Sequence, residues 1–312
     1  MSQRGRGRVL LAVLPSQGAS RMTILDEILT RKRREVVDAM RARPIDAVKA
    51  RALVQAPARS FASRLRTGPG RPARLIAEIK RRSPSAGAMA AITEPVSLAR
   101  AYATNGAAAI SVLTDFHYFG GSLDDLRAVH EAVDTPVLRK DFLFTEYQLW
   151  EARASGADAA LLIVSALASP LGNPDDLDEA PVGAEPDLAV AHDRLGRLMR
   201  VARKAGLEVL VEVHDAAEAA VAADLRAPVI GINNRNLATF ATSLATTEEV
   251  VSSLALQPGH NPVIVSESGL HDGADVSRVR RAGAHAVLVG EALVRAVDPA
   301  AKAREMAGAI AG

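Results

Sequence analysis

The sequence of 312 residues is long enough for two ordinary domains or for a single α/β barrel, which commonly takes about 200–250 residues. It contains no cysteine, which excludes disulfide scaffolds, thiolate nucleophiles and cysteine-ligated metal sites, and its 48% hydrophobic but 3% aromatic composition predicts an aliphatic core suited to a buried parallel sheet. The net charge of +2 is unevenly divided, because residues 1–74 hold 17 Lys/Arg and 5 Asp/Glu and so carry +12, which leaves −10 for the remainder.

The first 21 residues precede any predicted element, and we expect them to form a disordered tail. RVLLAVL at 8–14 follows three arginines, but this apolar run is short for a signal peptide and no convincing small-residue cleavage site follows it. No stretch approaches 18 consecutive apolar residues, so we expect no membrane-spanning segment. With the lack of cysteine, these features predict a cytoplasmic protein.

Helices are predicted between residues 22 and 72. Thr23 and Asp26 have the spacing of a capping box at the start of TILDEILTRKRREVV. The arginines of RKRREVVDAMRAR lie at helical spacing opposite Ile28, Val36 and Met40, which predicts a solvated helix face. Because no aromatic residues interleave with these basic residues, we expect no nucleic-acid partner.

After about residue 72 the sequence alternates short apolar runs with Ala-rich helical stretches. The eight predicted strands are LIAEIK (75–80), AAISVLTD (108–115), PVLRKDF (136–142), AALLIV (159–164), EVLVEVH (208–214), VIGINN (229–234), VIVSESG (263–269) and AVLVG (286–290). Eight such units with right-handed crossovers close most naturally into a single (β/α)8 TIM barrel. We expect this barrel to cover residues 22–312, with an N-terminal helical extension at 22–72.

One connection is unusually long. Residues 166–193, between the fourth and fifth strands, contain seven acidic residues, four prolines and no lysine or arginine. Such a composition can bury little surface, so we expect a solvated, mobile insertion loop at the face where barrels carry their active sites. Two interpretations stay open, a lid over the site and a tolerated insertion without a role.

Charged residues occur where the predicted strands end. Lysine is scarce, with six of the 38 basic residues, yet Lys80 and Lys140 close the first and third strands. A lysine is needed where a cation must transfer a proton, which a guanidinium does not readily do. The carboxylates at the same level are Glu78, Asp141, Glu212 and Glu267. Such an array allows proton transfer in both directions, although each residue alone could be a structural ion-pair partner.

The last three strands add groups for binding an anion. Asn233 and Arg235 at the end of the sixth strand supply an amide and a carboxylate-binding fork. SESG (266–269) and VGEA (289–292) place glycines where backbone N–H groups can approach a phosphate. The seven histidines show no metal-ligand spacing and no P-loop is present, so we expect no metal and no cofactor. These residues indicate acid–base chemistry on a phosphorylated small molecule.

The motifs together resemble those of the indole-3-glycerol phosphate synthase family of tryptophan biosynthesis. EIKRRSPS, SVLTDFHYFGGS, VLRKDF, LVEVHD, IGINNRNL, SESG and LVG occur in this order within roughly residues 22–308. The resemblance implies a carbon–carbon lyase, specifically a carboxy-lyase. Such an enzyme converts 1-(2-carboxyphenylamino)-1-deoxyribulose 5-phosphate to indole-3-glycerol phosphate by condensation, decarboxylation and dehydration.

The resemblance also implies roles for individual residues. Lys140 matches the general acid toward the ribulose carbonyl, and Lys80 matches a second lysine that contacts the substrate and has been considered as the acid in the dehydration. Glu212 matches the glutamate of the acid–base pair, and Glu78 matches the one that orients the lysines. The matches at substrate-binding positions are Ser83, Pro84, Phe119, Phe142, Asn233, Arg235 and Glu267, and those at the phosphate loops are Ser268, Gly269, Gly290 and Glu291.

Three features depart from the family pattern: Glu291 stands where many relatives have serine, and both the 166–193 insertion and the tail before Met22 are extra. No second barrel follows the first, so we do not expect the isomerase activity that accompanies this one in some bifunctional proteins. Two other functions stay open. One is a sugar-phosphate isomerase, or an aldolase with Lys80 or Lys140 as Schiff-base nucleophile, and the other is a barrel that only binds a phosphorylated metabolite. The sequence predicts no particular oligomeric state.

Overall fold

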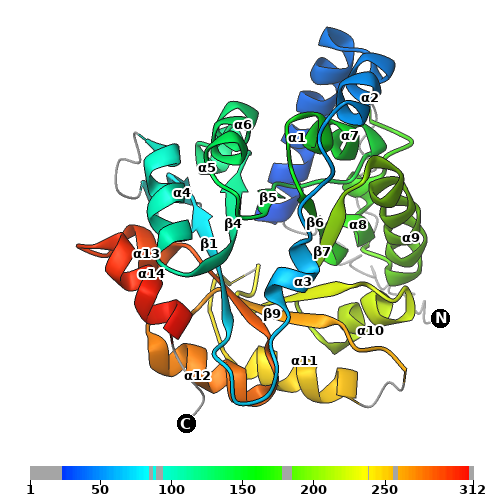
Figure 1. Cartoon of the computed structure of the whole chain (residues 1–312). Helices are drawn as coiled ribbons and strands as arrows, with labels where there is room; N and C mark the ends of the chain where they lie inside the picture. The colour runs from blue at the N-terminus through cyan, green and yellow to red at the C-terminus, as the bar shows by residue number, and fades with distance from the viewer. Residues whose placement is uncertain are drawn as a thin grey trace, which may run out of the picture.

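The computed structural model describes residues 23–83, 87–88, 94–177, 185–237, 239–255 and 259–308. Eight parallel strands form a closed barrel in the order β1-β10-β9-β8-β7-β6-β5-β4 (Figure 1). Their bounds are β1 Arg74–Ile79, β4 Ala107–Leu113, β5 Val137–Lys140, β6 Ala159–Ile163, β7 Glu208–Val213, β8 Val229–Asn233, β9 Val263–Glu267 and β10 Ala286–Val289. Each lies within one residue of a predicted run or inside it, and the predicted (β/α)8 barrel is confirmed.

Helices surround the barrel and connect its strands (Figure 1). They are α1 Ile24–Ala42, α2 Ile45–Leu53, α3 Phe61–Leu65, α4 Pro95–Thr104, α5 Phe116–Phe119, α6 Leu123–Ala132, α7 Glu146–Ala154, α8 Val164–Ala168, η1 Pro170–Gly172, α9 Leu188–Ala205, α10 Ala216–Asp224, α11 Ala245–Ala255, α12 Gly273–Ala282, α13 Glu291–Val294 and α14 Pro299–Gly308. A short antiparallel ribbon of β2 (Arg82–Ser83) and β3 (Gly87–Ala88) follows β1. Within the described ranges, no helix has both the length and the apolar character needed to cross a membrane.

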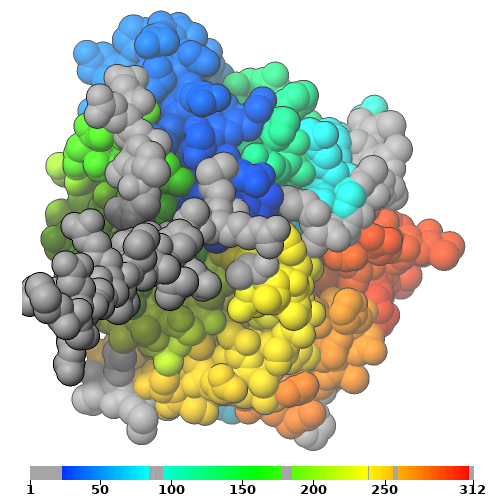
Figure 2. Space-filling model, turned by 180° about the vertical axis from the view of Figure 1, so that it is seen from behind, coloured from blue at the N-terminus to red at the C-terminus, as the bar shows by residue number. Residues whose placement is uncertain are grey.

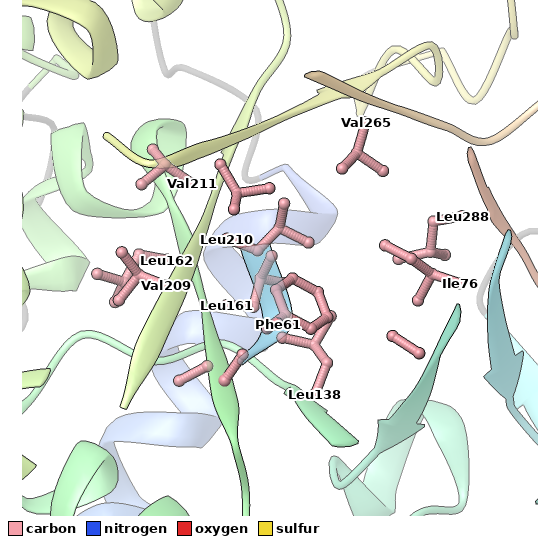
Figure 3. Packing of buried hydrophobic residues seen from close by; sticks show 14 of the residues in the cluster. Phe61, Ile76, Leu138, Leu161, Leu162, Val209, Leu210, Val211, Val265 and Leu288 are labelled. Atoms are coloured by element: carbon pink, nitrogen blue, oxygen red, sulfur yellow. The ribbon is translucent and has the colours of Figure 1, made fainter. Parts of the chain in front are cut away.

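Aliphatic side chains from the strands fill the barrel interior. Those that Figure 3 shows gathered there include Ile76, Leu138, Leu161, Leu210 and Leu288. Phe61 of α3 lies among them and is fully buried. The carboxylate of Glu208, the first residue of β7, accepts a hydrogen bond from the backbone N–H of Ala62 (2.6 Å) and so fixes α3 at the amino-terminal end of the barrel. Because this end is packed, the space for a ligand lies at the other end.

The helix α1 begins at the predicted capping box. Thr23 Oγ1 accepts a hydrogen bond from the backbone N–H of Asp26 (3.2 Å), and the Asp26 carboxylate accepts one from the backbone N–H of Thr23 (2.9 Å). In Figure 2 the dark blue residues of α1 lie on the same face of the molecule as the yellow residues that follow β8. The N-terminal helix therefore belongs to the carboxyl-terminal face of the barrel.

The predicted solvated face of α1 is wrong at two positions. Lys32 and Arg33 are only 5% and 2% exposed, whereas Met40, expected on the apolar face, is 40% exposed. The Lys32 ammonium forms ion pairs with Asp115 (2.8 Å) and Asp141 (3.0 Å), which follow β4 and β5. These carboxylates compensate for burial of the cation, and a helical pattern alone cannot reveal partners so distant in sequence.

The predicted 166–193 loop is also wrong at both ends. Residues 166–168 belong to α8 and are buried, and α9 begins at Leu188, where the Asp187 side chain caps the helix. These flanks contain apolar residues and no proline, so they form helices that pack on the barrel. Of the acidic, Pro-rich stretch between them, residues 178–184 lie outside the described part of the chain, as does the tail predicted at 1–21.

Candidate active site

A cavity lies at the carboxyl-terminal ends of the barrel strands. Its floor includes Leu161 and Leu288 of the barrel interior, and its wall includes Ile24, Leu25 and Ile28 of α1. The predicted site residues that line it are Glu78, Lys80, Ser83, Phe119, Lys140, Phe142, Glu212, Asn233, Arg235, Glu267, Ser268, Gly269, Gly290 and Glu291. Pro84 lies outside the described residues. Folding therefore brings together all of the predicted site residues that the structure describes.

Lys140, the last residue of β5, forms ion pairs with one carboxylate on β7 and one on β9. Its Nζ atom lies 2.9 Å from Glu212 Oε2 and 3.1 Å from Glu267 Oε2. Burial alone lowers the pKa of the Lys140 ammonium, but Glu212 and Glu267 outweigh burial and raise it. Lys140 therefore keeps its proton throughout the neutral pH range and is available as a charged hydrogen-bond donor.

The two carboxylates differ in their surroundings. Burial alone raises the pKa of the Glu212 carboxyl group. The charges of Lys140 and His214 and a hydrogen bond from Asn233 Nδ2 (3.0 Å) outweigh burial and lower this pKa to about 2. For Glu267, burial and the charge of Glu212 outweigh Lys140 and raise the pKa to about 7. The site thus combines one firmly ionised carboxylate with one that exchanges its proton near neutral pH.

Lys80 and Glu78 form a second pair. Lys80 Nζ lies 2.6 Å from Glu78 Oε1, as expected for residues two positions apart on one side of a strand. A Cβ atom added at Gly290 would overlap Glu78 Oε1. Gly290 is therefore required for the β10 strand to approach this carboxylate. Glu78 contacts Lys80, whereas Lys140 is held by Glu212 and Glu267.

The loops after β8, β9 and β10 meet beside the acid–base groups. Ser268 Oγ donates to Asn233 Oδ1 (2.8 Å), and Ser268 and Gly269 both have positive φ values of 65° and 73°. The carboxylate of Glu291 turns toward Arg295 (3.0 Å) and Arg235 (3.8 Å). Glu291 thus has cationic partners of its own. The backbone N–H groups of the loops after β9 and β10 therefore stay available to an anionic ligand.

Sequence reasoning missed His214 and misplaced Asp141. His214 follows β7 and its Nε2 atom lies 3.5 Å from Glu212 Oε1, a contact that the spacing Glu-x-His at a strand end could have indicated. Asp141 borders the cavity but pairs with Lys32 and Arg139, and both cations lower its pKa although burial alone raises it. Asp141 thus ties α1 to the barrel instead of joining the acid–base array. Within the described ranges, no group of three or more His, Asp or Glu side chains is arranged so that it could hold a metal ion.

The fold and the cavity are those of (β/α)8-barrel enzymes that act on phosphorylated small molecules. A family model described as "Indole-3-glycerol phosphate synthase" matches residues 25–174 and 188–306. The chain belongs to this family, whose members are carboxy-lyases of tryptophan biosynthesis. Between its two matched ranges the family model leaves residues 175–187 unmatched, a shorter stretch than the insertion predicted at 166–193.

Individual relatives agree with the family match. The chain is 44% identical over 279 residues to the indole-3-glycerol phosphate synthase of Laribacter hongkongensis, covering 89% of this chain and 96% of that one. It is 50% identical over 234 residues to that of a Nocardioides species, covering 75% and 80%. A solved 3-hexulose-6-phosphate synthase from Salmonella typhimurium shares the fold at 15% identity and a TM-score of 0.53, covering 75% of this chain and 96% of that one.

Proposed function

We propose that Lys140 and Glu212 are the central acid–base pair for the conversion of 1-(2-carboxyphenylamino)-1-deoxyribulose 5-phosphate to indole-3-glycerol phosphate. The ring carbon that carries the carboxylate attacks the ketone carbon of the substrate, and negative charge develops on the ketone oxygen. A positioned ammonium stabilises this charge and donates its proton. The observation that carries the proposal is the ion-paired Lys140 in the cavity, held between Glu212 and Glu267.

Loss of carbon dioxide restores the aromatic ring. Dehydration then forms the carbon–carbon double bond in the five-membered ring of the indole product. This step removes a hydroxyl group, which needs an acid, and a proton from the neighbouring carbon, which needs a base. Lys80 and Glu78 supply such a second pair 2.6 Å apart in the same cavity. We assign the dehydration to Lys80, with Glu78 orienting its ammonium.

The two ends of the substrate have chemically different surroundings in the cavity. Phe119 and Phe142, whose ring centroids are 6.2 Å apart, offer an apolar wall for the aromatic ring of the substrate. We place Ser83, Asn233 and Arg235 around the carboxylate of that ring. The sugar phosphate is assigned to the loops with Ser268, Gly269, Gly290 and Glu291, through backbone N–H groups. Glu267 contacts Lys140, so we assign it to positioning that lysine.

The aldolase alternative requires a neutral lysine amine as nucleophile. Lys140 is a poor candidate, because its carboxylate partners raise its pKa. Borohydride reduction in the presence of a ketose phosphate tests this directly. An aldolase becomes covalently labelled, and we expect no label here.

A continuous assay of indole fluorescence with the carboxyphenylamino-deoxyribulose phosphate tests the proposal as a whole. We expect Lys140→Ala and Glu212→Gln to lower kcat by about 10²- to 10⁴-fold with the fold intact. Lys204→Ala, at an exposed position of α9, is the matched control and should behave like the wild type. A barrel that only binds the metabolite would give no fluorescence increase in any variant. The cytoplasmic location and the lack of a nucleic-acid partner stay predictions of the sequence.

A further inference from the structure

His214 lies between the active-site cavity and a second cavity. Glu212 lines the first, whereas His214 and Glu218 line the second, which has a volume of about 1050 Å³. The lining of the second cavity includes the exposed residues Asp215 and Thr239, so it communicates with solvent. A cavity of this size that is open to solvent and partly lined by polar side chains can hold water.

The two ring nitrogens of His214 face carboxylates on different sides. Nδ1 lies 3.1 Å from Glu218 Oε2, and the same oxygen accepts a hydrogen bond from the His214 backbone N–H (2.8 Å). Nε2 is buried, has no hydrogen-bond partner among the described residues, and lies 3.5 Å from Glu212 Oε1. Glu218 thus fixes the ring so that Nε2 points at Glu212, at a distance that a small movement shortens to a hydrogen bond.

Three carboxylates favour a positive charge on the His214 imidazole. They are Glu212 on β7, Glu218 on α10 and Glu267 on β9. Burial alone lowers the pKa of the His214 imidazole, but these three groups together raise it. The raised pKa favours the protonated ring, whose Nε2 atom faces Glu212.

The reaction itself calls for a proton supply. The substrate carboxylate leaves as neutral carbon dioxide and the hydroxyl group leaves as water, so one proton is taken up in each turnover. While substrate fills the mouth of the cavity, the acid–base pair has limited access to solvent from that side. A second route must then deliver the proton.

We propose that His214 is a positioning residue that holds Glu212 and resupplies it with protons from the second cavity. Once Lys140 has donated its proton to the substrate, Glu212 loses the cation that lowers its pKa and can accept a proton. The His214 Nε2–H bond then breaks as an O–H bond forms at Glu212 Oε1, and the Glu212 carboxyl group passes a proton on to Lys140 Nζ, which lies 2.9 Å from its Oε2 atom. The neutral ring keeps its Nδ1–H, and a swing of the side chain into the second cavity, which His214 lines, lets Nε2 take up a proton from water before the ring returns to Glu212. This inference rests on the proposed role of Glu212, and it adds a residue that acts through that carboxylate without touching the substrate.

His214→Asn tests the inference with the full-length enzyme and the same fluorescence assay. We expect kcat to fall about 10- to 100-fold while KM stays within about twofold, a smaller loss than for a group that protonates the substrate itself. The wild-type kcat should decline at high pH as the imidazolium loses its proton, and the variant should lack this decline. His192→Asn is the matched control, because His192 pairs with Asp224 (2.8 Å) but lines neither cavity.

Imidazole added to His214→Ala separates proton supply from a merely structural role. We expect saturable recovery of kcat, strongest at pH values where imidazole is protonated, in a variant whose circular dichroism matches the wild type. If either His214 variant does not fold, Glu218→Gln replaces it and should move the high-pH decline to lower pH. Wild-type kcat and pH dependence in a folded variant, or a lowered kcat without imidazole recovery, overturns the inference. An inactive wild-type enzyme instead refutes the proposed function.

Discussion

Replacing Lys140 by methionine should destabilise the protein in a pH-dependent way. The side chain of similar length removes the cation but leaves Glu212 and Glu267 facing each other at 3% and 1% exposure. Removing one partner of a buried ion pair costs about 3–5 kcal/mol. For domains of 150–250 residues each kcal/mol shifts Tm by about 2–4 °C, so we expect Tm to fall by about 6 °C or more.

The sign of the pH effect follows from the two carboxylates. Without the Lys140 cation, burial raises the pKa values of Glu212 and Glu267 in the folded protein above their values in the unfolded chain. The variant therefore loses stability as pH rises from the unfolded-state pKa to the folded-state pKa, because the folded protein must then bury ionised carboxylates. Differential scanning calorimetry at pH 5.5 and pH 8 should therefore show the larger Tm deficit at pH 8. Adding Glu267→Gln removes one buried charge and should recover part of the Tm without recovering turnover. A Lys140→Met protein with wild-type Tm at pH 8 refutes the reasoning.

Three further predictions follow from other contacts. Gly231→Ala should lower the free energy of unfolding by about 1–3 kcal/mol and should also lower kcat, because the new Cβ atom overlaps Glu267 Oε1. Unchanged kinetics would contradict this close approach. Lys32→Met should loosen α1 and raise KM, seen as faster hydrogen exchange in α1, whereas wild-type protection would show that the buried ion pairs do not hold the helix. The free energy of unfolding of the wild type, measured in urea, should fall as pH drops from about 4.5 toward 2. Glu212 and Asp141 have lowered pKa values in the folded protein, so over this range the unfolded chain binds protons that the folded protein does not. A flat profile would contradict the ion pairs.

The strands could be predicted because each is a short, mainly apolar run that is followed by polar residues. This pattern reflects burial on both faces of a parallel sheet, which is a local property of the sequence. The position of Lys140 at a strand end was predictable for the same reason. Its partners were not, since Glu212 and Glu267 are 72 and 127 residues away and meet it only when the barrel closes.

The buried basic residues of α1 show the same limit of pattern reasoning. A helical pattern assigns charged residues to the solvated face, because an unpaired buried charge is costly. Lys32 is buried in spite of this rule, because it pairs with Asp115 after β4 and Asp141 after β5. His214 was overlooked because the sequence shows that it neighbours Glu212 but not that a second cavity lies behind it.

Closure of the barrel between its first and last strands has a consequence for biosynthesis. Residue Arg74 of β1 is in register with Ala286 of β10, so at translation rates of about 5–20 residues per second the partner follows on the order of 10–40 s later. During this interval the outer edge of β1 is open to pairing with other chains. A nascent chain carries both lysines long before Gly290, which follows β10, reaches the ribosomal exit, so the active site can form only after β10 has been synthesised.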